Sequence, residues 1–427
     1  MNKKDVQPLS NPTAIQVVFI SVLKWACLAA FVGILGGTAS AIFLASLDWV
    51  TNFREDNLWI ITLLPLGGLI IGLGYHYWGE EVVKGNNLLI DEYYQPKAII
   101  PFKMAPMVLL GTLITHLFGG SAGREGTAVQ MAAAISDQFS RILKPDTDTR
   151  RLLIISGISA GFASVFGTPW AGAIFAIEVL INPKINYKVI ISSFLAAFVA
   201  DYTCNAWGIG HTHYSISDVP EMTALNLTIA AGAGILFGLT ALLFSASNHF
   251  WAKTFKSQIQ YPPFRPLIGG IVIAVSILLI GNTKYIGLGI PVIRQAFNEP
   301  LNSYDFLLKI LFTTFTLGAG FKGGEVTPLF YIGAALGNVL IWIFPLPMAL
   351  LAGMGFVAVF AGATNTPLAC VIMGIELFGI QSTPFITIAC TTAYFFSGTS
   401  GIYSSQKIGG MKLVLYEYLK LTQKNLT

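Results

Sequence analysis

The feature that most constrains this chain is a set of long apolar stretches with very few charges. Residues 15–47 and 57–77 are almost wholly apolar, and a helix crosses a bilayer with about 20 such residues. Of the 427 residues, 54% are hydrophobic and only 11% are charged, whereas a soluble domain carries about 25% charged residues. The sequence therefore predicts an all-α polytopic membrane protein embedded in a lipid bilayer.

Many later apolar segments are too short to cross a bilayer. Residues 171–180, 329–343 and 367–378 are apolar, and each is bounded by Gly, Pro or Asn. Helices that enter the membrane, stop near its middle and leave explain such segments, and their broken backbones must line an enclosed cavity. We also expect three glycines within residues 33–37 to interrupt the first long helix.

Basic residues gather in a few polar segments, which the positive-inside tendency places in the cytoplasm together with both termini. The first 14 residues are polar and lack an apolar core, so we expect no cleaved signal peptide. The net charge of +4 rests on few residues and does not indicate nucleic acid. The basic clusters are Lys3 with Lys4, residues 141–151, Lys184 with Lys188, and Lys407 with Lys412, Lys420 and Lys424.

Neither the cysteines nor the histidines indicate a cofactor or a metal. The cysteines have no CxxC spacing and lie in apolar or helical runs, so we expect buried small hydrophobic residues. His211 and His213 lie near Asp218; a solvated loop is favoured there over a metal site. The four cysteines are Cys27, Cys204, Cys370 and Cys390.

The chain contains an internal repeat. Residues 157–178 and 355–376 match at 10 of 22 positions, and residues 117–127 and 317–327 match at 5 of 11. The offsets between the paired segments are 198 and 200 residues. Because the two offsets agree, the repeat spans both halves of the chain.

We expect one transmembrane domain made of two repeat halves. The first half is residues 1–222, with an N-terminal cytoplasmic segment and a polar linker at 207–222, and the second half is residues 223–427, with a short tail. Repeats with interrupted helices at matching places indicate a transporter whose site lies between the halves. An odd number of crossings per half would make the repeats inverted, which we favour.

Residues 119–127 place Arg124 and Glu125 among glycines and apolar residues, just before a small-residue helix expected at 128–142. The start of a helix presents unpaired N–H groups and about half a positive charge, which favours anions. An ionisable residue at membrane depth costs at least about 2.5–3.5 kcal/mol. Glu125 is therefore a functional candidate, with a purely structural Arg124–Glu125 pair as the alternative.

The same stretch also fits the Gly-x-Ser-x-Gly pattern of a hydrolase. Residues 157–161 fit that pattern equally well, and His116 is the only histidine near the first match. No acid–base partner set accompanies either serine. We therefore do not expect an enzyme.

Four glycine-bearing breaks carry hydrogen-bond donors or a titratable group: residues 85–89, 119–127, 324–328 and 400–403. Residues 287–291 are the second-half counterpart of the first break. Asparagine amides, helix-start N–H groups and a tyrosine O–H are all donors. Donors without a lysine suit a small anion that must bind and then leave.

A competing class is a cation transporter that uses acidic residues as ligands. Those acids would have to converge with backbone carbonyl groups, whereas these breaks precede helix starts and favour anions. The acids concerned are Glu125, Glu178, Glu325 and Glu376.

At these four breaks the chain resembles the CLC family of anion channels and proton-coupled antiporters, over about residues 25–410. Residues 123–126 match the family's GREGP motif, which makes Glu125 the counterpart of its gating glutamate. Residues 85–89 take the place of GSGIP, residues 324–328 that of GxFxP, and Tyr403 that of the ion-contacting tyrosine. The resemblance implies a CLC-like fold of two inverted repeats with many tilted and broken helices, and a homodimer with one pore per subunit.

The departures from the family motifs resemble the fluoride-specific subclass, bacterial proteins that expel fluoride in exchange for protons. Asn86 and Leu89 replace the serine and proline of GSGIP, Thr127 replaces the proline of GREGP, and Val326 replaces the phenylalanine of GxFxP. The resemblance implies fluoride/proton antiport across the bacterial cell membrane, and a chloride/proton antiporter or passive chloride channel is the alternative. It does not imply a C-terminal regulatory domain.

On this resemblance, Glu125 is the gate and the proton carrier, and Glu325 lies on the proton and anion pathway. Val179 stands where proton-exchanging relatives carry a second, inner glutamate, which puts that relay in doubt. Lys322 is expected to be a snorkelling surface lysine, and Glu178 and Glu376 either bind exposed backbone N–H groups or relay protons. The implied anion-binding residues are Asn86, Asn87, Gly126, Thr127, Val326, Thr327 and Tyr403.

Overall fold

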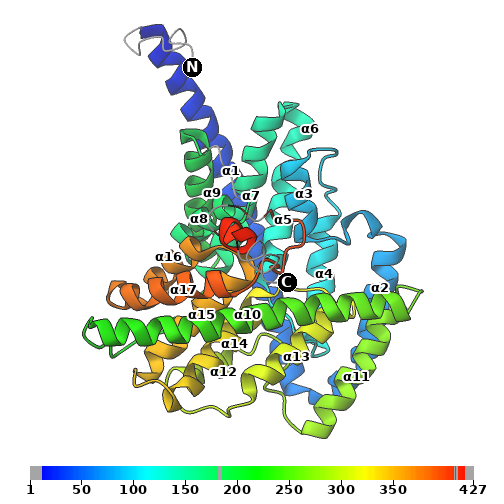
Figure 1. Cartoon of the computed structure of the whole chain (residues 1–427). Coiled ribbons are helices and arrows are strands. Elements are labelled where there is room, and N and C mark those ends of the chain that lie inside the picture. Colours follow the sequence, from blue (N-terminus) through cyan, green and yellow to red (C-terminus); the bar gives the residue numbers. More distant parts are fainter. Residues whose placement is uncertain (1–11, 181–184, 408, 410–411, 419–427) are drawn as a thin grey trace.

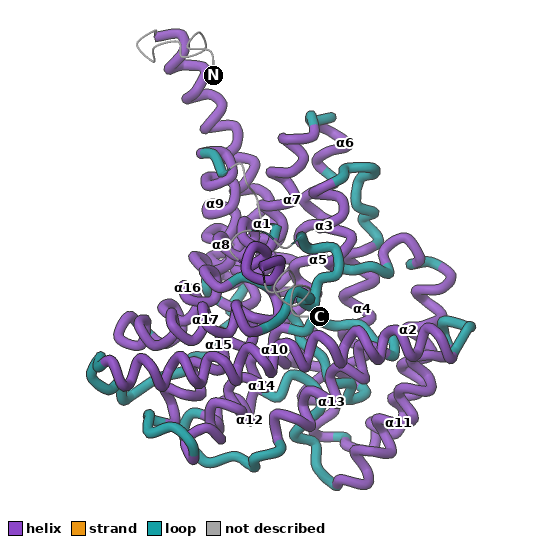
Figure 2. The backbone as a smooth tube through the Cα atoms, in the orientation of Figure 1, coloured by secondary structure: helices purple, strands orange, loops and turns teal. Residues whose placement is uncertain are grey.

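The computed structural model describes residues 12–180, 185–407, 409 and 412–418, so the expected N-terminal segment lies outside the described residues. The described residues are mainly helical and contain no β-strand (Figure 2). The first-half helices are α1 (Pro12–Asp56), α2 (Leu64–Tyr77), α3 (Asn86–Tyr94), α4 (Met104–Leu117), α5 (Glu125–Asp137), α6 (Phe139–Leu143), α7 (Thr147–Phe166), α8 (Pro169–Val179) and α9 (Tyr187–Ala206).

The polar segment at 207–223 contains no helix. The helices that follow it are α10 (Ala224–Gln258), α11 (Phe264–Ile280), α12 (Ile290–Ala296), α13 (Asp305–Gly318), α14 (Val326–Val339), α15 (Met348–Thr364), α16 (Pro367–Phe378) and α17 (Thr383–Phe396). In Figure 1 the helices α3, α6, α7 and α9 lie above α10–α15, and α2 packs beside α11.

The lengths of the helices agree with a polytopic protein that contains broken segments. Among the described residues, five helical stretches are long and apolar enough to cross a membrane, and six further apolar helices are shorter. One of the short ones, α16, has the bounds expected from the sequence. The stretch at 57–77 is divided instead, because a short 3-10 helix at Leu58–Leu63 precedes α2 and Pro65 sits in the first turn of α2.

The expected break in the first long helix is wrong, because α1 runs without interruption from Pro12 to Asp56. The glycines permit close packing against α9. A Cβ atom at Gly37 would lie 2.4 Å from the carbonyl oxygen of Ala200, and one at Gly33 would lie 2.9 Å from that of Ala196. In a membrane, such small residues let two helix backbones approach each other.

The equivalent segments of the two halves meet as antiparallel partners. Gly123 and Gly324 form an isolated antiparallel bridge, with N–H···O distances of 2.6 and 2.8 Å. Helices α8 and α16 also pack together, and each binds the other's N-terminus through a glutamate. Such reciprocal contacts are those expected of inverted repeats. The division at 222/223 stays a prediction.

A buried ion cluster fixes α3, the helix that begins with Asn86, against α5 and α7. Arg150 of α7 binds Asp137 of α5 at 2.8 Å and Glu92 of α3 at 3.1 Å. Asp137 also accepts a hydrogen bond from the N–H of Ile100 at 2.8 Å. Removing one partner of such a cluster would leave an uncompensated buried charge, which costs about 3–5 kcal/mol.

Candidate functional site

Three helix N-termini converge where the two halves meet. Helix α5 begins at Glu125, α14 begins directly after Glu325, and α3 begins directly after Gly85, whose φ of +57° favours glycine. A Cβ atom at Gly126 would lie 3.0 Å from the Nδ2 atom of Asn86 and 4.0 Å from a carboxylate oxygen of Glu325. Helix α5 begins three residues before the start expected from sequence, and it ends at Asp137, with α6 following separately.

The carboxylate of Glu125 occupies the N-terminus of α14. Glu125 is 1% exposed. Its Oε2 atom accepts hydrogen bonds from the backbone N–H of Thr327 at 3.0 Å and of Arg124 at 3.2 Å, and its Oε1 atom accepts one from the Thr327 hydroxyl at 2.5 Å. The carboxyl group of Glu125 is therefore bound by three donors, two of them from the opposite half of the chain.

The structural alternative, an Arg124–Glu125 pair that fastens two helices, has little support. The Nε atom of Arg124 lies 3.6 Å from Oε1 of Glu125 and makes no hydrogen bond to a described residue. The two residues are also neighbours in sequence. Thr327, in the other half, makes the shorter contacts with the carboxylate.

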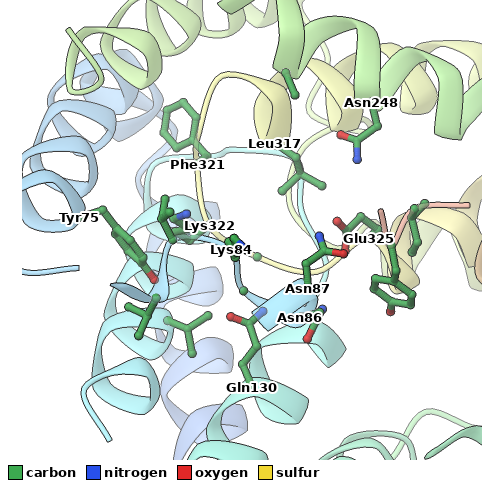
Figure 3. Close-up of a pocket in the computed structure, with 18 residues that line it drawn as sticks. Tyr75, Lys84, Asn86, Asn87, Gln130, Asn248, Leu317, Phe321, Lys322 and Glu325 are labelled. Atoms are coloured by element: carbon green, nitrogen blue, oxygen red, sulfur yellow. The ribbon is translucent and has the colours of Figure 1, made fainter. Parts of the chain in front are cut away.

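A cavity of about 320 Å³ lies beside the converging helix starts (Figure 3). The carboxylate of Glu325 borders it and makes no hydrogen bond to another described residue. The Oδ1 atom of Asn86 is buried and has no hydrogen-bond partner among the described residues, whereas the Oδ1 atom of Asn87 accepts a hydrogen bond from the N–H of Ser405 at 2.9 Å. The polar lining includes Asn86, Asn87, Gln130, Lys322, Glu325 and Tyr403.

The remaining candidate residues lie behind this surface. The hydroxyl of Thr127 is hydrogen-bonded to that of Thr112 at 2.7 Å, and both are fully buried. Val326 is 1% exposed and packs in the core. The structure thus brings four of the candidates to one cavity: Asn86, Asn87, Glu325 and Tyr403. It brings Thr327 to Glu125. It does not place the side chains of Thr127 and Val326 on the cavity wall.

Comparison with known proteins identifies the family. Residues 67–398 match the family model described as voltage gated chloride channel. The chain belongs to the CLC family. A protein of Pseudomonas syringae pv. tomato named chloride/fluoride channel protein is 50% identical over 397 residues, which cover 92% of this chain and 88% of that protein.

Solved CLC structures agree with the fold. The crystal structure of a CLC-type fluoride/proton antiporter is 34% identical, with a TM-score of 0.87, and the match covers 94% of this chain and all of that one. A slow cyanobacterial Cl⁻/H⁺ antiporter is 19% identical, with a TM-score of 0.77 and coverage of 94% and 99%, and supports the fold alone. The all-α, multi-pass CLC-like fold expected from the sequence is thereby confirmed.

One prediction about this CLC site is wrong. Lys322 is not a snorkelling surface lysine, because its ammonium lies in the cavity, 4.0 Å from the centre of the Tyr75 ring. Sequence reasoning also missed Gln130, which is 7% exposed and borders the same cavity. The sequence did contain a feature that could have placed Lys322 at the site, because it lies inside a glycine-rich break, three residues before Glu325.

Glu178 and Glu376 of this CLC chain bind backbone N–H groups. Glu178 accepts hydrogen bonds from Leu368 and Ala369, and Glu376 accepts them from Trp170 and Ala171, at 2.8–3.0 Å. These contacts fit the structural interpretation of the two glutamates. Val179 is 3% exposed, and its carbonyl oxygen accepts a hydrogen bond from Gln406 at 3.1 Å.

The other sequence candidates carry no catalytic or metal arrangement. The hydroxyl groups of Ser121 and Ser159 are hydrogen-bonded to Thr313 and Ser193, so neither contacts a histidine as a hydrolase would require. Among the described residues, no group of three or more His, Cys, Asp or Glu side chains is placed to hold a metal ion. Three of the four cysteines are buried as expected, but Cys27 is exposed.

Proposed function

We propose that this protein expels fluoride from the bacterial cell in exchange for protons. The observation that carries the proposal is the carboxylate of Glu125, held by three donors at a helix N-terminus that would otherwise bind an anion. A related protein named chloride/fluoride channel protein and a solved structure of a CLC-type fluoride/proton antiporter support the choice of ion.

Glu125 is the gate in this proposal because its charge decides what occupies the site. A hydrogen bond to a charged group is worth about 1.5–3 kcal/mol, and one to a neutral group about 0.5–1.5 kcal/mol. Protonation of Glu125 therefore weakens its hold on Thr327 and Arg124. The neutral side chain leaves, and fluoride takes the same donors.

The cavity supplies the rest of the pathway. Glu325 passes protons between the cavity and Glu125, and Tyr403, Asn86 and Asn87 offer donors that replace part of the fluoride hydration shell. Gly126, Thr127 and Val326 contribute backbone at the start of α5 and α14, where unpaired N–H groups favour an anion. No cofactor and no metal take part in this scheme.

The assembly and its orientation belong to the same proposal. We infer a homodimer with one pore per subunit, inserted in the bacterial plasma membrane with both termini in the cytoplasm. The two repeat halves, residues 1–222 and 223–427, enclose each pore. The reciprocal contacts between α8 and α16 support the pairing of the two halves within one chain. The basic residues within 141–151, on and around the loop between α6 and α7, support the orientation.

A flux assay tests the proposal. Purified protein in liposomes should release fluoride far faster than chloride or sodium, and an outward fluoride gradient should drive proton uptake. Comparable rates for the two halides would favour the chloride/proton antiporter. Anion flux that moves no protons would identify a passive channel, and sodium flux would favour the alternative of a cation transporter.

A further inference from the structure

Lys322 borders the cavity and has no ion-pair partner among the residues that the structure describes. Among the described residues, no carboxylate oxygen lies within 4.0 Å of its ammonium, which rests over the ring of Tyr75 (Figure 3). Other lysines in this part of the protein are paired: Lys84 binds Asp91 at 2.9 Å, and Lys103 binds Glu81 at 3.1 Å. The positive charge of Lys322 is therefore not compensated by an ion pair.

The surrounding helices hold this lysine in place. The backbone N–H of Lys322 donates to the hydroxyl of Thr115 at 3.3 Å. A Cβ atom at Gly111 would lie 2.9 Å from Cγ of Lys322 and 3.5 Å from the Tyr75 ring. The glycine thus makes room for the lysine stem between α2 and α4, and the face of the Tyr75 ring attracts the ammonium. These contacts keep the charge at the cavity instead of at a membrane surface.

An uncompensated ammonium in a confined polar space has one clear electrostatic consequence. It raises the local concentration of anions, because the field of a charge in a cleft with low-dielectric walls is focused into that cleft. Glu325, on the opposite side of the cavity in Figure 3, opposes this field when it is ionised and stops opposing it when it is protonated. The attraction for an anion is therefore strongest when Glu325 carries a proton.

We propose that Lys322 is the anion-capture residue of this transporter. It draws fluoride from water into the cavity before fluoride reaches the donors at the starts of α3, α5 and α14. The inference rests on the proposed function, and it assigns to Lys322 the step of anion capture. Glu125 and Glu325 retain the gating and proton steps.

The test compares charge removal at two lysines. Lys322→Met removes the cavity charge, and Lys103→Met removes the same formal charge from an exposed pair on the protein surface. Initial fluoride release from liposomes is measured over a range of fluoride concentrations. We expect the KM for fluoride to rise about tenfold in Lys322→Met with kcat within about twofold, to rise by less than about threefold in Lys322→Arg, and to stay unchanged in Lys103→Met. A tenfold change corresponds to about 1.4 kcal/mol.

Ionic strength separates electrostatic capture from a packing role. Salt screens interactions between charges, so an impermeant salt should raise the KM of the wild type and have little effect on that of Lys322→Met. Should Lys322→Met fold poorly, Lys322→Cys in a Cys27→Ser background allows the charge to be restored. Aminoethyl methanethiosulfonate should return the KM toward the wild-type value, and the neutral methyl reagent should not.

Several results would overturn the assignment. These are a wild-type KM in Lys322→Met, an equal KM rise in Lys103→Met, or equal rescue by the charged and neutral reagents. The wild-type protein tests the proposed function separately. If it carries chloride and not fluoride, the proposed function fails, and the same KM comparison with chloride still decides the role of Lys322.

Discussion

Two pairs of equivalent glutamates behave differently in this protein. Glu178 and Glu376 keep the symmetry of the repeat, since each binds two backbone N–H groups at the start of the other's helix. Glu125 and Glu325 have lost it. Glu125 is bound by three donors, two of them from Thr327, whereas the Glu325 carboxylate faces a cavity and bonds to no other described residue.

On the proposed function, this difference separates contacts that hold the two halves together from contacts along the transport pathway. A reciprocal contact fastens the two halves to each other in the same way on both sides. A transport pathway must instead carry an ion from one side to the other, so the equivalent positions along it have different tasks. The threonines that follow the glutamates show the same divergence, because Thr327 binds Glu125 and Thr127 binds Thr112.

The largest effect on transport is expected from Glu125→Gln. Glutamine fixes a neutral side chain of nearly the same volume and cannot carry a proton. We expect a fluoride gradient to drive proton uptake no faster than in protein-free liposomes. Fluoride movement itself will stop if every turnover requires the acid, or continue uncoupled if it does not. Proton uptake at the wild-type rate would remove Glu125 from the mechanism.

Glu325→Gln should have the second largest effect. The exposed side of this carboxylate borders the cavity, so its loss removes a proton-carrying group without breaking a hydrogen bond to another described residue. We expect fluoride turnover to fall about tenfold, with protein yield and the elution profile of the purified protein unchanged. An unchanged fluoride rate would show that Glu325, like Glu178 and Glu376, has a structural role.

The parts of the fold that the sequence predicts depend on local patterns. Helix α16 has the expected bounds because it is an apolar run closed by residues that break helices. Glu125 is proposed as a functional residue because an acid in an apolar region is costly, and Glu325 because the repeat sets it at the equivalent position. Both arguments use only neighbouring residues and the repeat.

The parts that the sequence did not predict depend on contacts between distant segments. Gly33 and Gly37 look like helix breakers until α9 is known to pack against them. Lys322 looks like a surface lysine because neither Tyr75 nor Gly111 is near it in sequence, although both enclose it in the fold. The hydroxyl of Thr127 turns away from the pathway for a similar reason, since its partner Thr112 belongs to another helix.

A smaller effect is expected from Thr327→Val, with Thr127→Val as the matched control. Valine keeps the shape of threonine but removes the hydroxyl that donates to Glu125, while the backbone N–H of residue 327 remains. One hydrogen bond to a charged group is worth about 1.5–3 kcal/mol. In the proposed cycle fluoride uses the same hydroxyl donor, so the substitution weakens the binding of both Glu125 and fluoride and the two losses partly cancel. We therefore expect turnover to slow about three- to tenfold. Thr127→Val should change the rate less than about twofold. Equal effects of the two substitutions would contradict the assigned asymmetry of the threonines.

The smallest effect on transport is expected from Glu178→Gln and Glu376→Gln. Glutamine retains one acceptor oxygen, but its NH2 group takes the place of the other and cannot accept. Each variant therefore loses one of its two hydrogen bonds, and the remaining one, no longer made to a charged group, weakens by about 1 kcal/mol. Because the contacts are reciprocal, the two variants should lower the melting temperature in detergent by similar amounts, about 2–5 °C. The number of protons moved per fluoride should stay at the wild-type value in both. A changed number of protons per fluoride in Glu178→Gln alone would show that Glu178 and Glu376 also differ in function. It would also show that a proton passes Glu178 even though Val179 stands where the family's acid is expected.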